Sequence, residues 1–137
     1  MSVAHSVQQA AFVQHVDIAA ERVRFHLDGL KKALAVGGDT HGVEDVLAQV
    51  ARGDAQLWTE PDGVIVTEVA DAPKCRELRF WIATGKLETV LAMHERIIVW
   101  ARGMGCTQAV LTGRRGWVKA LAGSGWVEQM VVMGRKL

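Results

Sequence analysis

The sequence predicts an α/β (α+β) fold in which helices flank a mixed, mostly antiparallel sheet of five to six strands. Three observations support this prediction. Residues 12–34 carry apolar side chains at helical spacing, residues 55–83 have the composition of strands, and residues 78–112 read as strand, helix, strand. The chain has 137 residues, half of them hydrophobic, so we expect a single domain over residues 1–137.

The first third of the chain is predicted to be helical. Its apolar residues recur at steps of three and four, which places them on one helix stripe: Phe12, Val16, Ala20, Val23, Leu27, Leu30 and Leu34. Gly37-Gly38 ends this helix, Asp39 or Thr40 can cap a second one, and that helix stops near Gly53. We therefore expect an N-terminal helical arm over 1–38 and a core over 39–137. The stripe also fits a coiled coil, but it covers only about three heptads, which favours packing on the chain's own sheet.

A hairpin and a third strand follow. Gln56–Thr59 and Val64–Val69 are strand-like, and Pro61-Asp62-Gly63 between them is a turn in which proline presets φ and glycine supplies a positive φ. After a second turn at 71–74, residues 78–83 alternate, so that Leu78, Phe80 and Ile82 should share one face.

The second half of the chain predicts a parallel strand pair. A strongly apolar helix over 87–102 leads directly into a strand over 108–112, and a strand, helix, strand unit makes its two strands parallel. A short helix over 117–122 and a closing strand over 126–133 complete the predicted order.

Composition excludes several classes of protein. No apolar run approaches the roughly 20 residues that span a bilayer, so no membrane partner is expected. Residues 1–95 hold 9 Lys/Arg and 14 Asp/Glu, whereas residues 96–137 hold 7 and 1. This uneven charge suits an oriented protein partner or self-association. No Lys/Arg cluster is dense enough to predict nucleic-acid readout. Cys75 and Cys106 lie far apart and are expected to be reduced thiols.

Two local motifs carry a family resemblance. Ala101-Arg102-Gly103-Met104-Gly105-Cys106 and Leu121-Ala122-Gly123-Ser124-Gly125-Trp126 are similar to the end of the central helix and to the late helix-to-strand corner of the GNAT superfamily, the acyl-coenzyme-A-dependent N-acyltransferases. The resemblance covers about residues 40–137 and implies a GNAT-like fold. It would imply acetyl-CoA as cofactor if the functional residues were kept.

Those functional residues depart from the family pattern. The family's phosphate loop, Arg/Gln-x-x-Gly-x-Gly/Ala, falls on Gly85 to Val90, where Glu88 and Val90 replace the two glycines. A carboxylate repels a diphosphate, and we expect the Val90 side chain to occupy the space of the phosphate. The general-acid tyrosine position is Leu121, and the chain has no tyrosine. The family's first strand is absent or reduced to a stub around Val3. We therefore expect no cofactor and no catalytic residues, and the sequence favours a protein that is not an enzyme.

Three further segments resemble small bacteriophage proteins encoded among virion genes. They are Gly53-Asp54-Ala55-Gln56-Leu57-Trp58, Val66-Thr67-Glu68-Val69 and Gly113-Arg114-Arg115-Gly116-Trp117. This resemblance implies a non-catalytic structural or packaging component of a virion, in an internal core or at the head–tail region. It would be made in the bacterial cytoplasm and bind other virion proteins or copies of itself. The alternatives are a divergent acyl-CoA-dependent N-acetyltransferase and a regulatory protein that binds a host factor.

The candidate interaction residues lie near the two ends of the chain. Arg114 and Arg115 fit an acidic partner, Trp117 beside them is the tryptophan expected to be exposed, and Phe12 and Val16 lie on the helical arm. Other side chains have a chemical and a structural interpretation. His94 could be a base but is better read as a hydrogen-bonded core residue. Glu68 and Glu77 could be general bases but are better read as solvated strand carboxylates. The histidines are scattered and predict no metal site, and Cys106 is expected to be structural.

Overall fold

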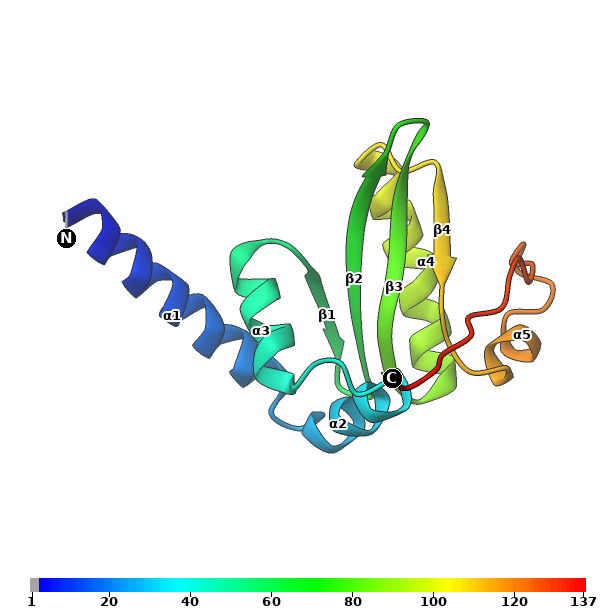
Figure 1. Ribbon diagram of the computed structural model, residues 1–137, viewed down its shortest axis with the longest axis horizontal. Coiled ribbons are helices and arrows are strands. Elements are labelled where there is room, and N and C mark those ends of the chain that lie inside the picture. Colours follow the sequence, from blue (N-terminus) through cyan, green and yellow to red (C-terminus); the bar gives the residue numbers. More distant parts are fainter. Residues whose placement is uncertain (1–2) are drawn as a thin grey trace.

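The computed structural model describes residues 3–137 as a four-stranded sheet with helices on both faces (Figure 1). Three helices come first: α1 (Val3–Val23), α2 (Leu27–Val36) and α3 (Val43–Arg52). Three strands follow: β1 (Gln56–Glu60), β2 (Gly63–Ala72) and β3 (Cys75–Gly85). The chain then forms α4 (Leu87–Gly103), β4 (Gln108–Leu111) and α5 (Gly116–Ala120). The mixed α+β class is confirmed.

The strands lie in the order β1-β2-β3-β4. β1, β2 and β3 pair antiparallel, whereas β4 pairs parallel to β3 through α4. This confirms the predicted hairpin and the predicted parallel pair. Residues 3–137 form four strands rather than the expected five to six, because residues 126–133 form no strand. Strand composition alone is insufficient for that segment: a β-strand needs a neighbour to accept and donate its backbone hydrogen bonds.

Two predictions about the N-terminal helices are corrected. The continuous helix expected over 12–34 is broken at residues 24–26, and the His26 N–H donates to Val23 O at 2.8 Å in the break. Val23 of α1 and Leu30 of α2, on either side of the break, are buried in the same core. Neither Asp39 nor Thr40 caps α3. Its N-cap is Gly42, whose N–H donates to the Asp45 carboxylate at 2.8 Å.

The sheet has one hydrophobic core on each face. On one face, α1, α2 and α3 contribute to a core with the following buried members: Ala19, Val23, Leu30, Leu34, Val46, Leu47, Ala55, Leu57, Val64, Val66 and Ile82. On the other face, α4 packs over these buried residues: Ile65, Leu78, Phe80, Val90, Met93, Ile97 and Ala101. The expected arm over 1–38 is thus part of the fold from Val16 onward, and Val3, the expected strand stub, lies in α1.

A bulge in β3 divides its side chains between the two cores. Val66 of β2 pairs with Ile82, whereas the next residue, Thr67, pairs with Phe80, so Trp81 has no partner. A bulge of this kind reverses the alternation of side chains beyond it. Phe80 therefore faces α4, whereas Ile82 faces the α1–α3 layer. The expected sharing of one face by Leu78, Phe80 and Ile82 is wrong at Ile82 for this reason.

Candidate functional site

The parallel pairing of β3 and β4 ends at Phe80 and Leu111, and the unpaired region beyond these residues is called the gap between the strands below. Their register runs from Glu77–Gln108 to Phe80–Leu111 and stops there, while β3 continues to Gly85. A gap between parallel strands is a place where a ligand can bind in α/β proteins. We therefore consider first whether the residues at this gap fit the acyl-coenzyme A that the sequence resemblance implies.

The connection from β3 to α4 leaves no room for a phosphate loop. Only Lys86 lies between the two elements, and its N–H donates to Asp62 O in the β1–β2 turn at 2.8 Å. Gly85 has a φ of 129°, and a Cβ added to it would overlap Asp62 O. Glycine is required here so that β3 can approach the hairpin turn closely. Gly85 and the Lys86 N–H are thus both used in contacts with the β1–β2 turn, and neither is free to bind a phosphate.

The two positions that carry glycine in the family also fail to form a phosphate site. Glu88 is exposed in the first turn of α4, where a carboxylate disfavours a bound diphosphate. Val90 is 3% exposed and belongs to the core under α4. The expectation that its side chain fills the phosphate space is wrong, because the helix turns Val90 inward. The residues present do not fit the coenzyme's phosphates.

His94 lies in an aromatic cluster on the inner face of α4. Its ring stacks on Phe80 at 4.1 Å between centroids and on Trp117 at 5.7 Å, and the Trp126 ring lies at 6.2 Å. The residue is 1% exposed, and neither ring nitrogen has a hydrogen-bond partner. Burial lowers the pKa of His94 from 6.5 to about 4. The core position was predicted, but the hydrogen bond that we expected there is absent.

Trp117 and Trp126 close the space next to the separated strands. Trp117 is the second residue of α5 and Trp126 follows the turn after that helix, and both pack against the core under α4. Trp126 also meets Phe80 edge-on at 5.8 Å. Trp117 is therefore half-buried rather than exposed as expected. Its role in binding a partner stays a prediction.

An open hollow of about 1230 Å³ lies along the free edge of β4. It is lined by β4, by β3 only as far as Ile82, by α5 and by the segment after Trp126, and on another side by the end of α2 and the loop after it, with Ala33, Leu34, Gly37 and Thr40. The only residues of α4 that line it are Ile98, Ala101 and Arg102, in the second half of that helix. The hollow therefore does not reach the first turn of α4, where the family binds its coenzyme. It borders the edge of the sheet.

The carboxylates near the hollow are poor candidates for a base. Glu77 accepts hydrogen bonds from Arg79 at 2.8 Å and from Gln108, and the pKa of Glu77 is lowered, first by Arg79 and then by Gln108. A lowered pKa keeps this carboxylate ionised and makes it a weaker base. Burial raises the pKa of the Cys106 thiol, which keeps it protonated and unreactive. The Cys106 finding agrees with its structural interpretation. Glu77, expected to be a solvated carboxylate, is instead only 17% exposed and is held by these two hydrogen bonds.

The predicted interaction residues lie in two separate places. Arg114 and Arg115 are exposed at the start of α5 and line the hollow. Phe12 and Val16 are half-buried on α1, and Val16 packs against the chain's own core. The structure thus brings the two arginines to the hollow but leaves the α1 pair apart from them. Among residues 3–137, no three His, Cys, Asp or Glu side chains are placed to hold a metal ion.

Sequence reasoning missed the free edge of β4. The signal that pointed to it was present, because residues 126–133 have strand composition and no other described strand is available to pair with β4.

The described helices include none that is both long and apolar enough to cross a membrane.

Comparison with known proteins supports the fold. No protein-family model matches the chain, and no curated protein matches it. Among solved structures, TTHA1254 from Thermus thermophilus is similar with a TM-score of 0.56 and 18% identity, covering 81% of this chain and 89% of that one. A probable acetyltransferase is similar with a TM-score of 0.58 and 11% identity, covering 90% and 91%. At these identities the likeness concerns the fold alone: the chain has an acetyltransferase-like, mixed α+β fold.

Proposed function

We propose that this chain is a non-enzymatic subunit that acts through protein–protein contacts. One observation carries the proposal: the C-terminal segment, residues 126–133, is largely apolar, forms neither helix nor strand, and lines the same hollow as the free edge of β4 without pairing with it. Its side chains are 72–90% exposed at the following positions: Val127, Met130, Val131, Val132 and Met133. An exposed apolar run next to unpaired strand hydrogen-bonding groups is typical of a surface that another chain covers.

The region where acyl transfer would occur supports the same proposal. An acyltransferase must hold the coenzyme's phosphates next to the separated strands. Here the linking N–H of Lys86 is bonded to Asp62 O, and Trp117 covers His94 beside the gap. His94, the one histidine of α4, is enclosed by aromatic rings, so it could not take a proton from a substrate.

Calorimetry with acetyl-CoA tests the non-enzymatic part of the proposal. We expect no saturating heat when the full-length chain is titrated at millimolar ligand, whereas an active acetyltransferase titrated in the same buffer gives one. The Trp117→Ala variant is the matched control, because it opens the gap beside His94 without restoring any phosphate-binding group. It should also give no heat. Saturable binding by the wild type would overturn the proposal.

We further propose that the assembly is a bacteriophage particle, in an internal core or at the head–tail region. The three sequence segments that resemble virion-encoded proteins support this, together with the exposed C-terminal segment. Mass spectrometry of purified particles from the phage or prophage that carries the gene provides the test. The chain should be present at a fixed number of copies per particle. Its absence from intact, infectious particles would refute the virion role.

A divergent acyl-CoA-dependent N-acetyltransferase is the second candidate. It is favoured by one observation, the separation of β3 and β4 beyond Phe80 and Leu111, in a fold that resembles a probable acetyltransferase. The calorimetric experiment separates the two candidates directly, because only the acetyltransferase requires the coenzyme to bind.

A further inference from the structure

The segment from Trp126 to Met133 and the free edge of β4 are complementary parts of one surface. β4 pairs only with β3, and no other described strand lies beside it. Its outer backbone N–H and C=O groups therefore lack strand partners. The segment after Trp126 supplies β-branched residues at 127, 131 and 132, which favour strands. The chain thus contains an unpaired strand edge and a segment suited to pair with it, but the two are not hydrogen-bonded to each other.

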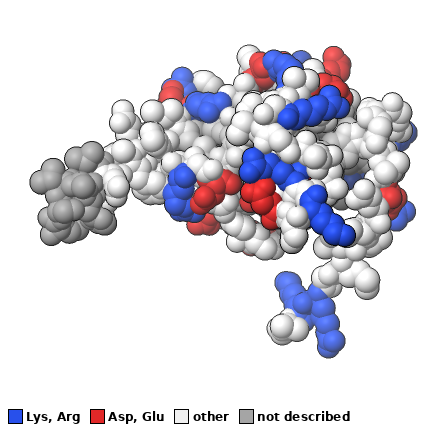
Figure 2. Space-filling view, turned by 90° about the horizontal axis from the view of Figure 1, so that it is seen from above, with Lys and Arg blue, Asp and Glu red and all other residues white. Residues whose placement is uncertain are grey.

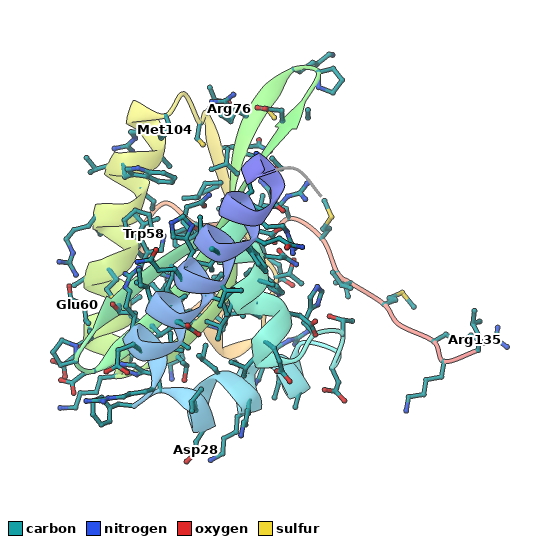
Figure 3. The ribbon with its side chains drawn as sticks, turned by 90° about the vertical axis from the view of Figure 1, so that its left-hand side faces the viewer. Asp28, Trp58, Glu60, Arg76, Met104 and Arg135 are labelled. Atoms are coloured by element: carbon teal, nitrogen blue, oxygen red, sulfur yellow. The ribbon has the colours of Figure 1, made fainter. Side chains whose placement is uncertain are left out.

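The chain's own C-terminal segment leads away from its own β4. Gly123 and Gly125 both have positive φ, at 80° and 84°, and turn the chain after α5. Figure 1 shows the chain turning back after α5, on the side of β4 that faces away from β3. Figure 3 shows Arg135 at the outlying end of the segment, well outside the body. In Figure 2 a basic cluster likewise stands apart from the rest of the molecule.

Charges determine how such a segment would pair. At one end of β4, Glu77 is paired in register with Gln108, and the hollow is also lined there by Glu68, Arg79 and Arg102. Glu77 is ion-paired with Arg79, so the charges of these four residues balance. At the other end, Arg114 and Arg115 follow the strand. The chain after Trp126 has the same acidic-to-basic order along its direction, with Glu128 near the start of the C-terminal segment and Arg135 and Lys136 just beyond its end.

An antiparallel pairing brings unlike charges together at the Arg114–Arg115 end of β4. Glu128 would lie beside Arg114 and Arg115, while Arg135 and Lys136 would lie at the Glu77 end. A parallel pairing would place Arg135 and Lys136 beside Arg114 and Arg115, where like charges repel. The antiparallel arrangement is therefore the favoured one.

We propose that two copies of this chain exchange their C-terminal segments, each segment adding a fifth, antiparallel strand to the β4 edge of its partner. The exchange covers both free edges and both apolar segments in one closed, two-fold arrangement. A different protein that added a strand to β4 would leave the exposed C-terminal segment uncovered. The proposal rests on the proposed function and names the partner as a second copy.

Solution mass gives the first test, by light scattering after size-exclusion chromatography. The wild type should have twice the chain mass. Deletion of residues 128–137 removes only exposed residues and should give a monomer. Because a deletion can impair folding, a full-length variant with Val131→Asp and Val132→Asp serves as a second test, and it should also be monomeric. A monomeric wild type, or a dimer that survives either change, would overturn the proposal.

Charge reversal gives the sharper test. Glu128→Arg alone, or Arg114→Glu with Arg115→Glu, places like charges together and should weaken dimerisation roughly tenfold. Arg52→Glu, a reversal at the end of α3, is the matched control and should leave dimerisation unchanged. A chain that carries Glu128→Arg, Arg114→Glu and Arg115→Glu together should form the homodimer again, because its segment and its edge then have opposite charges.

Mixing the variants separates exchange between copies from folding back within one copy. When the Glu128→Arg chain is mixed with the Arg114→Glu/Arg115→Glu chain, a segment and an edge of opposite charge become available to each other. The mixture should therefore form a heterodimer more tightly than either chain forms a homodimer. If both chains stay monomeric in the mixture, or associate no better than alone, strand exchange is wrong. This outcome would leave the calorimetric test of the proposed function untouched, whereas acetyl-CoA binding would overturn that function whatever the mass.

Discussion

Replacement of His94 by phenylalanine should remove a specific loss of stability at acidic pH. The His94 ring is 1% exposed between Phe80 and Trp117, and neither nitrogen has a partner. In the unfolded chain the imidazole takes up a proton near pH 6.5, whereas burial lowers the pKa of His94 in the folded protein to about 4. Between these values the unfolded state binds more protons, so protonation favours unfolding.

The sign and the size of the effect follow from these two pKa values. Neutral His94 leaves the folded state fully stable above about pH 6.5, and stability is lost progressively as the pH falls toward 4. At about 1.4 kcal/mol for each pH unit, the full loss is about 3 kcal/mol, and about 2 kcal/mol of it is present at pH 5. His94→Phe has no titrating group and keeps an aromatic ring between Phe80 and Trp117. It also removes the buried unpaired nitrogens, which should add about 1 kcal/mol at pH 7.5, less any cost of the larger ring.

Urea unfolding at pH 7.5 and pH 5 measures the effect. The wild type should lose about 2 kcal/mol more than His94→Phe between these two pH values. The exposed carboxylates titrate in both proteins, so the difference isolates His94. His15→Phe, a change at an exposed histidine of α1, is the matched control for the loss of one imidazole. If the wild type and His94→Phe lose the same stability on acidification, His94 is not buried in its neutral form and the reasoning fails.

Four other changes test separate contacts by the same unfolding assay. Gly85→Ala should lower the free energy of unfolding by at least about 2 kcal/mol, because a Cβ at a φ of 129° overlaps Asp62 O. Gly103→Ala is the control and should change it by less than about 1 kcal/mol, because nothing lies near the added Cβ. Trp58→Phe removes the hydrogen bond from its Nε1 to Thr67 Oγ1 at 3.0 Å and should cost about 1 kcal/mol, since Thr67 keeps its bond to Gln56. Arg96→Ala breaks a largely exposed ion pair with Glu60 and should cost less than about 1 kcal/mol. Trp117→Ala should lower the free energy of unfolding by about 2 kcal/mol. It should also reduce the loss of stability between pH 7.5 and pH 5, because it admits water to His94. An unchanged acid sensitivity would show that Trp117 does not shield the His94 ring.

The middle of the chain was predictable because its signals are local. Pro61-Asp62-Gly63 forms a turn whatever surrounds it, and the structure places the β1–β2 turn there. The apolar helix after Lys86 and the strand after Gly105 are joined by a connection that permits only a parallel pair. The absence of a phosphate loop was also visible in the sequence, since its glycine positions are Glu88 and Val90.

The features that sequence reasoning missed depend on contacts between distant segments. The break at residues 24–26 has no signal in the apolar spacing, which runs through it unchanged, and Val23 and Leu30 on either side of it share one core. The bulge at Trp81 is visible only in the register of β3 against β2. The segment 126–133 has the composition of a strand, but composition does not supply the neighbour that a strand requires.

The bulge at Trp81 also bears on how the separated strands should be interpreted. It turns Trp81 and Ile82 toward the α1–α3 core and leaves Ala83 against the α4 core, so β3 serves both layers within a few residues. A strand that changes direction in this way cannot continue straight alongside β4, and the pairing ends at Phe80 and Leu111, next to the bulge. The separation then brings Trp117 and Trp126 against His94 and Phe80, which joins four rings in one cluster. Packing of the two cores thus accounts for the strand separation on its own, and the separation is not by itself a sign that a coenzyme binds.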